Sequence, residues 1–286
     1  CTDARNLQFS ISVVKEIQQH HIHDCDHCYD NADILLSVYI MKAASEYLFG
    51  VRIDLHDYSD LDRCIDAALI DRAPVFLTAP HFHILLMARR ETWLRTLLNT
   101  SSINYIDGIG TWLGICALSG HRAPRINGTD YHHSLLQRSL ADGRRVFLLG
   151  GDEYTAKQLA LRLREQFPRA ALEVQPGTID IADDSIVDAI RSFQPDLLFL
   201  GLGTPLQFEW MHRHAAALTV PVILATGAFL DFAAGTRPRA PRWMRRIGLE
   251  WLHRLLHEPR RLWRRYILGI PAFVFLVLRE KLSSSR

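Results

Sequence analysis

Asp107 is the residue of this sequence best suited to act as a general base. The segment INYIDGIGTWLG places its carboxylate at the end of an apolar stretch, among glycines and aromatic residues. A carboxylate that is partly removed from water holds its proton more tightly, and its raised pKa then suits proton abstraction near neutral pH. The alternative is that Asp107 caps a helix that starts at Ile109.

Glycines mark further candidate sites, because they let backbone N–H groups approach a phosphate at the start of a helix. Such turns follow apolar stretches at Asp107-Gly108, Gly150-Gly151, Gly201-Leu-Gly203 and Gly227. None matches G-x-G-x-x-G, and the chain has no G-x-S-x-G or Walker motif. The turns are either tight connections or parts of one site for a nucleotide-type ligand.

Two patterns raise the question of a bound metal. Asp24-Cys-Asp26 and Asp60-Leu-Asp62 match D-x-D, and HHIHDCDHC at 20–28 contains Cys25-x-x-Cys28. Neither D-x-D follows one of the glycine-ended strands, and no second cysteine pair lies at zinc-finger spacing. We therefore expect a reaction without a metal or other cofactor, and a structural metal at 20–28 is the alternative.

The C-terminal region is strongly basic. Residues 239–269 hold nine arginines and three tryptophans but no lysine. Residues 237–286 contain 13 basic and 3 acidic residues, whereas the rest of the chain contains 20 basic and 28 acidic ones. This asymmetry predicts an anionic partner: nucleic acid, a membrane surface or a phosphorylated substrate. No helix-turn-helix or RRM pattern accompanies the arginines, which argues against nucleic acid.

The apolar run YILGIPAFVFLVL at 266–278 follows the arginines. As a helix it would reach roughly 20 Å, short of the ~30 Å hydrocarbon core of a bilayer. It therefore either lies in a membrane interface or packs on its own domain or a partner chain. The five cysteines are odd in number and thinly spread, which favours a reducing compartment.

These residues need strands and helices to position them, and the chain alternates between the two. The pattern predicts helices at 59–69, 83–99, 153–167, 184–193 and 206–218, and strands at 49–55, 73–79, 102–108, 144–151, 171–177, 195–205 and 220–227. Alternation of this kind predicts an α/β fold with a mostly parallel sheet covered by helices on both faces. In the arginine-rich region, one helix ends before Pro259 and the next begins there and ends near Gly269.

Several segments resemble the WecG/TagA/CpsF glycosyltransferases, which form glycosyltransferase family 26. The resemblance covers about residues 49–266 and rests on YIDGIG (105–110), RINGTD (125–130), VFLLGG (146–151), PDLLFLGLGTPLQ (195–207) and the long block at 226–265. It implies a Rossmann-like domain at 49–236 and a C-terminal Arg-rich helical appendage at 237–286. Residues 1–48 would form an extension of uncertain structure.

The resemblance also implies a reaction and roles for residues. The family transfers a sugar, with inversion and without a metal, from a nucleotide donor to a polyprenyl-diphosphate-linked acceptor at the inner face of bacterial membranes. Asp107 resembles the proposed base, and the arginines implied to hold the acceptor diphosphate are Arg254, Arg261 and Arg264. Arg260 and Arg265 would then serve the anionic membrane. The positions implied for the donor pocket are Thr78, His81, Arg125, Gly150, Gly151, Gly201, Gly203, Gln207 and Asp231.

Two departures from the family pattern bear on the donor sugar. His81 stands where the family usually has asparagine, and Leu206 stands where many members have lysine in Pro-Lys-Gln-Glu. Loss of this lysine favours a UDP-sugar of the glucose type, in exopolysaccharide assembly, over N-acetylmannosamine or N-acetylmannosaminuronate. We expect a peripheral enzyme on the cytoplasmic face of the inner membrane that does not bind nucleic acid. The alternative is a non-catalytic protein that binds nucleic acid or membrane through its basic region. The sequence leaves a homo-oligomer open.

Overall fold

A parallel six-stranded sheet forms the centre of the protein. The computed structural model describes residues 44–120 and 122–284, and within them the strands lie in the order β4-β3-β8-β7-β5-β6, all parallel. Their bounds are β3 Val75–Thr78, β4 Ile103–Asn104, β5 Val146–Gly150, β6 Leu172–Gln175, β7 Leu197–Gly201 and β8 Val222–Ala225. The predicted α/β class with a parallel sheet is confirmed.

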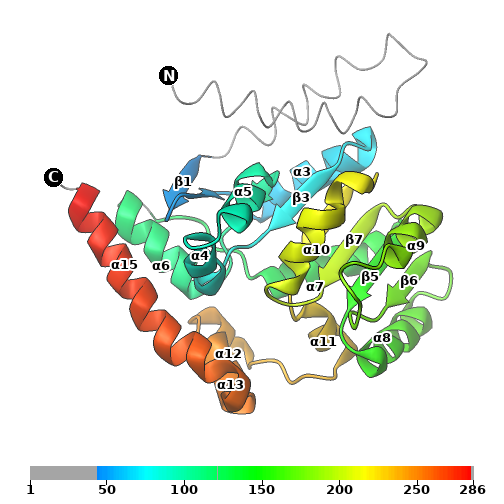
Figure 1. Cartoon of the computed structure of the whole chain (residues 1–286). Coiled ribbons are helices and arrows are strands. Elements are labelled where there is room, and N and C mark those ends of the chain that lie inside the picture. The colour runs from blue at the N-terminus through cyan, green and yellow to red at the C-terminus, as the bar shows by residue number, and fades with distance from the viewer. Residues whose placement is uncertain (1–43, 121, 285–286) are drawn as a thin grey trace, which may run out of the picture.

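Helices cover both faces of this sheet, because the central strands are apolar at consecutive positions (Figure 1). Val146 and Leu148 face one layer, and Phe147 and Leu149 face the other. The first layer contains α3 (Tyr58–Asp71), α7 (Gly128–Ala141), α8 (Glu153–Gln166) and α11 (Phe229–Ala234). The second contains α4 (Phe82–Ala88), α5 (Thr92–Thr100), α6 (Ile109–Ser119), α9 (Ser185–Phe193) and α10 (Leu206–His214).

The sheet has a switch point between β5 and β7. Helix α8 leaves β5 toward one face and α10 leaves β7 toward the other, so a crevice opens between the carboxyl ends of these neighbouring strands. Gly150 and Gly201 pair there in register. A Cβ at Gly150 would lie 2.5 Å from the carbonyl oxygen of Gly201, so only glycine permits this close approach.

A hairpin extends the other end of the sheet. Strands β1 (Ser45–Leu48) and β2 (Val51–Asp54) pair antiparallel, and Asp54 bridges to Tyr105 beyond β4. The first described strand therefore starts at Ser45, four residues before the domain start expected from the sequence.

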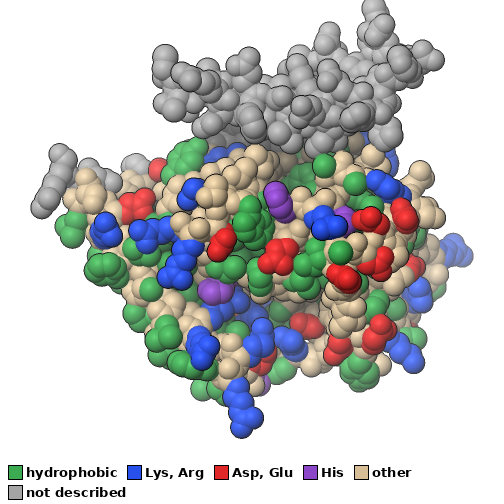
Figure 2. All heavy atoms as spheres, viewed as in Figure 1, with side chains coloured by type: hydrophobic (Ala, Val, Ile, Leu, Met, Phe, Trp, Pro, Cys, Tyr) green, Lys and Arg blue, Asp and Glu red, His purple; other side chains and the backbone are tan. Residues whose placement is uncertain are grey.

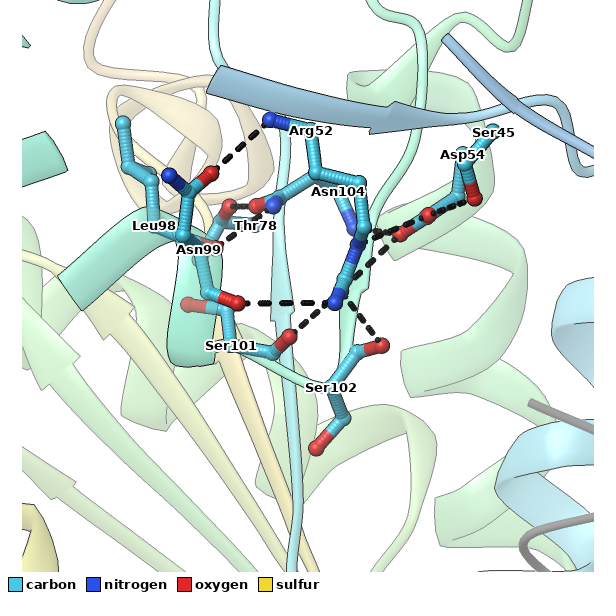
Figure 3. Close-up of polar contacts among 9 residues, drawn as sticks. All are labelled: Ser45, Arg52, Asp54, Thr78, Leu98, Asn99, Ser101, Ser102 and Asn104. Atoms are coloured by element: carbon cyan, nitrogen blue, oxygen red, sulfur yellow. Dashed lines mark hydrogen bonds and ion pairs between the residues drawn. The ribbon is translucent and has the colours of Figure 1, made fainter. Parts of the chain in front are cut away.

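A polar network centred on Arg52 fixes this hairpin to α5 (Figure 3). The Arg52 guanidinium donates to the carbonyl oxygens of Ser101 and Ser102 at 2.6 and 3.0 Å, and its Nε lies 2.9 Å from Asp54. Asp54 in turn accepts from the backbone N–H of Asn104 at 2.8 Å. The network holds the start of β4, and with it the segment that leads to Asp107.

Helix boundaries differ from the sequence pattern in two places. Asp57, rather than Ser59, caps α3: its carboxylate accepts from the N–H of Asp60, whose side chain accepts from the N–H of Asp57. The predicted helix at 83–99 is divided into α4 and α5. Helix α6 begins at Ile109, where the alternative role of Asp107 required a helix, and α7 occupies a segment to which no helical pattern was assigned.

The basic region forms a chain of short helices and one long one. These are α12 (Arg242–Arg246), α13 (Glu250–His257), α14 (Pro259–Trp263), a π-helical turn (Arg264–Leu268) and α15 (Gly269–Ser284). The expected helix end near Gly269 is wrong, because the π turn leads directly into α15. Phe273 and Val277 of α15 are buried, and this helix runs beside α6 and α4 (Figure 1).

The opposite side of α15 is apolar and exposed at Val274, Phe275, Leu278 and Leu282. Figure 2 shows Lys and Arg side chains gathered over the C-terminal helices, with hydrophobic side chains between them. Within residues 44–120 and 122–284, no helix has both the length and the apolar composition to cross a bilayer.

The Arg52 network generates a prediction about stability. Replacing Arg52 with Met should lower the free energy of unfolding by about 3 kcal/mol, because it leaves the buried Asp54 carboxylate without its cation. The matched control is Arg63→Met, which breaks the exposed Arg63–Asp60 pair and should cost less than about 1 kcal/mol. Urea unfolding measures both; equal costs would contradict the assigned role of the network.

Candidate active site

A cavity of about 540 Å³ lies at the carboxyl ends of the central strands. Its floor is formed by the glycine turns that follow β5, β7 and β8, with Gly151, Gly201, Gly203 and Gly227 in its wall. The C-terminal arginines close the opposite side. Its size suits a nucleotide-sized ligand, and it brings together residues that lie far apart in the chain.

Asp107 lies in this cavity wall, half-buried, just beyond β4. Its carboxylate accepts a hydrogen bond from the backbone N–H of Gly128, the first residue of α7, at 3.2 Å. Burial raises the pKa of Asp107 to about 6, and Glu250 adds to the rise, although the backbone N–H groups of Gly128 and Gly108 oppose it. The side chain is therefore largely ionised at neutral pH and can still accept a proton.

The alternative role of Asp107 as the cap of α6 does not fit the geometry. Gly108 is the N-cap residue of that helix, and no side chain caps it. Gly128 also leaves no space for a side chain, because a Cβ there would lie 3.1 Å from Oδ2 of Asp107 and 3.0 Å from the Tyr105 hydroxyl. The Asp107 carboxylate instead sits between the start of α7 and the cavity.

Two helix N-termini face the cavity at the switch point. The segments Gly151-Asp152 and Gly203-Thr204 line it immediately before α8 and α10. Asp152 caps α8 by accepting from the N–H of Thr155 at 2.7 Å. The positive ends of these helices suit an anionic group such as a diphosphate.

Gln207, Asp231 and His81 also line the cavity, as expected from the sequence. The Gln207 side chain accepts from the N–H of Gly227 at 3.1 Å and so ties α10 to the turn after β8. Asp231 lies 3.3 Å from Arg237; burial raises its pKa, although this arginine opposes the rise. His81 is the N-cap residue of α4 and contacts an arginine of the basic region.

Three of the expected pocket residues do not line the cavity. Thr78 is buried at the end of β3 and bonds to the Asn104 side chain. Gly150 lies behind the wall, against Gly201. Arg125 donates to the carbonyl oxygens of Arg245 and Arg246, at 3.4 and 3.2 Å, and so caps α12. These residues shape the site or dock the basic region, and do not contact the cavity themselves.

Acidic residues of the body hold the basic region in place. Asp130, in the first turn of α7, accepts from Arg239 at 2.8 Å and from Arg245 at 2.6 Å. Glu258, within the basic region, pairs with Arg237 at 3.2 Å. Much of the positive charge is therefore used inside the protein, where it fixes the wall of the cavity.

The structure changes the expected set of cavity arginines. Arg254 and Arg261 line the cavity together with Arg237, and of the adjacent pair it is Arg265, not Arg264, that lines it. Arg264 is exposed, with its guanidinium 5.3 Å from the centre of the Trp263 ring. The π turn causes the difference, because its wider turn alters which residues share the face of Arg261.

Several other residues of the cavity are not among the site residues predicted from the sequence. Asp152 and Arg237 line the cavity, and so does His132, which is buried and bonds through Nε2 to the Tyr105 hydroxyl at 2.9 Å. Burial lowers the pKa of His132 to about 3, so its ring is neutral. The position of Asp152 directly after Gly150-Gly151, before a helix, is the one pattern that indicates such a role.

The candidate metal motifs lie elsewhere or outside the described residues. Asp60 belongs to the capping box of α3, and Asp62 accepts from Tyr131 and Arg138 at 3.0 and 3.1 Å. Asp24, Asp26 and the segment 20–28 lie outside the described residues. Within 44–120 and 122–284, no group of three His, Cys, Asp or Glu side chains is arranged to hold a metal ion.

Comparison with known proteins places this chain among glycosyltransferases. A family model described as "Glycosyl transferase WecG/TagA/CpsF family" matches residues 46–286. Proteins from Staphylococcus aureus strains MW2 and NCTC 8325 are 30% identical to this chain over 185 residues, which cover 65% of this chain and 72% of each relative. Both are named N-acetylglucosaminyldiphosphoundecaprenol N-acetyl-beta-D-mannosaminyltransferase.

The environment of Asp107 predicts how its replacement affects stability. Its pKa rises from 3.8 to about 6 on folding, so the folded state binds more protons, and wild-type stability should fall as the pH rises from about 4 to 6. Asp107→Asn has no carboxyl group that titrates at this position, so its stability lacks this decrease. The stability of the variant relative to the wild type should therefore increase between pH 4.5 and 7.5, by on the order of 2 kcal/mol.

Asp152→Asn is the matched control, because the pKa of Asp152 is lowered by its hydrogen bonds to Thr155 and its carboxylate stays ionised across this range. Its effect on stability should not depend on pH between 4.5 and 7.5. Thermal unfolding at both pH values measures the two variants. A pH-independent loss in Asp107→Asn would mean that Asp107 mainly anchors α7.

Proposed function

The chain belongs to the WecG/TagA/CpsF family of glycosyltransferases, and from this premise we propose that it transfers N-acetylmannosamine from a UDP-linked donor to a polyprenyl-diphosphate-linked N-acetylglucosamine acceptor. The names of the S. aureus relatives support this sugar and acceptor. They favour the alternative considered from the sequence over the glucose-type donor that the absence of the family lysine at Leu206 suggested. The observation that carries the proposal is the raised pKa of Asp107 in a cavity closed by arginines.

In the proposed mechanism, Asp107 takes the proton of the acceptor hydroxyl while that oxygen attacks the anomeric carbon of the donor sugar. The bond from the anomeric carbon to the diphosphate breaks, and inversion follows from attack on the opposite face. The leaving diphosphate gains negative charge, which the N-termini of α8 and α10 are placed to stabilise. No step of this mechanism uses a metal ion.

We propose that the acceptor diphosphate is held by the arginines of the basic region that line the cavity, Arg254 and Arg261 among them. Arg can grip phosphate oxygens through two N–H groups at once. The exposed apolar side of α15 and the exposed Arg260 and Arg264 would then lie against an anionic membrane, where the lipid carrier is found. This arrangement supports a peripheral enzyme at the cytoplasmic face of the membrane.

The donor and acceptor are tested by offering UDP-N-acetylmannosamine, UDP-N-acetylmannosaminuronate and UDP-glucose with a polyprenyl-diphosphate-linked N-acetylglucosamine. We expect transfer from UDP-N-acetylmannosamine, and we expect it to persist in EDTA. Transfer from UDP-glucose alone would support the glucose-type donor that the sequence suggested. Loss of activity in EDTA with rescue by Mg²⁺ or Mn²⁺ would refute the metal-free mechanism.

The role of Asp107 is tested by kinetics. Asp107→Asn should lower kcat by ~10²–10⁴, with little change in donor affinity, because the shape is kept and the proton acceptor is lost. In the wild type, only the ionised form of Asp107 is active, so kcat/KM should fall about tenfold per pH unit below a pH of about 6. The same acidic limb in Asp107→Asn would assign that ionisation to another group.

A further inference from the structure

His81 and Arg265 form a contact between the body and the basic region, at the cavity itself. His81 is the N-cap residue of α4, just after β3, and Arg265 lies in the π turn. One terminal nitrogen of the Arg265 guanidinium lies 2.7 Å from Nε2 of His81. Both side chains line the cavity. Arginine has only donors, so His81 accepts through Nε2 as a neutral ring; Nδ1 then carries the proton and does not accept from the N–H of Ile84, which lies 3.4 Å away.

The charges around the cavity distinguish Arg265 from Arg261 and Arg237. Arg261 donates to Glu258 at 2.6 Å, and Arg237 pairs with both Asp231 and Glu258. Arg265 makes no ion pair with a carboxylate of residues 44–120 and 122–284. Its Nε is buried and has no hydrogen-bond partner in the same part of the chain. A half-buried cation with a spare donor needs an anion to compensate it.

The neutral partner keeps the charge of Arg265 available. Burial lowers the pKa of His81 well below its usual range, and the nearby Arg265 lowers it further. Burial also lowers the pKa of Arg265 to about 10, which still leaves the guanidinium charged at neutral pH. A carboxylate at position 81 would hold Arg265 equally well, but it would neutralise the site. A neutral acceptor orients the guanidinium and leaves its full charge for a ligand.

We propose that His81 is a positioning residue that orients Arg265 toward the cavity, and that Arg265 is a binding residue for a diphosphate group there. The chemistry shared by the two candidate ligands, the lipid-linked acceptor and the nucleotide donor, is a diphosphate. The assignment of this diphosphate to a substrate rests on the proposed function. The existence of the anion site does not rest on the proposed function, and it is tested by a binding measurement without catalysis.

The test measures the Kd of inorganic pyrophosphate for the full chain by calorimetry. Arg265→Gln should weaken binding by at least about tenfold, the usual loss for a charge-assisted hydrogen bond. The matched control is Arg264→Gln, which removes the neighbouring exposed arginine and should change Kd less than about twofold. Equal effects of the two variants would overturn the role of Arg265.

Two replacements of His81 separate orientation from charge. Asn and Asp both serve well as N-cap residues, so α4 should be kept in both variants, and thermal unfolding checks this. His81→Asn offers Arg265 a neutral acceptor and should bind pyrophosphate within about threefold of the wild type. His81→Asp neutralises Arg265 and should bind at least about tenfold more weakly. Equal binding by the two folded variants would refute the proposal.

Kinetics then identify the source of the diphosphate. If Arg265 holds the acceptor, Arg265→Gln raises the KM for the lipid acceptor and leaves the KM for the donor unchanged; if it holds the donor, the reverse occurs. Either result supports a diphosphate site, whereas a fall in kcat with both KM values unchanged would contradict it. Pyrophosphate binding as expected, without sugar transfer to any lipid diphosphate, would support the anion site and refute the proposed function.

Discussion

The close contact between Gly150 and Gly201 is the constraint on which the site depends. These residues end β5 and β7 in register, and neither the sheet nor the cavity would keep its shape if a side chain separated them. Because the helices that follow leave toward opposite faces, the two strands end in a crevice and not under a helix. The N-termini of α8 and α10 then converge on one place, where no single helix could supply the same concentration of N–H groups.

The basic region closes the side of the cavity that the sheet leaves open. A parallel sheet presents one edge of turns and helix ends, which leaves a ligand open to solvent on the other side. The carboxylates of Asp130 and Asp231 draw arginines across that opening and fix them. The excess of acidic residues in the body and of basic residues in the C-terminal region therefore also acts within the protein, because ion pairs between them fix the second wall of the cavity. Arg125 adds to this wall by capping α12.

The sequence predicts the sheet and the floor of the site well, because both follow from local patterns. Continuous apolar runs identify buried strands, and glycines identify their ends, so Asp107, Gly151, Gly201 and Gly203 are found without knowledge of any contact. The wall of arginines is different. Arg264 and Arg265 are adjacent and chemically identical, and a π turn decides which of them lines the cavity. Contacts such as Arg265 with His81 join residues far apart in the chain, and no local pattern encodes them.

The groups of the cavity that can take up a proton lie apart from those that can bind a phosphate. The carboxylate that can accept a proton, Asp107, lies beyond β4, whereas the helix ends of the switch point lie beyond β5 and β7. Three strands of the sheet, β3, β8 and β7, separate β4 from β5. The groups suited to a proton and those suited to a leaving phosphate are thus held apart by the sheet itself. Arginines line the side of the cavity opposite its floor, where they can neutralise a bound diphosphate.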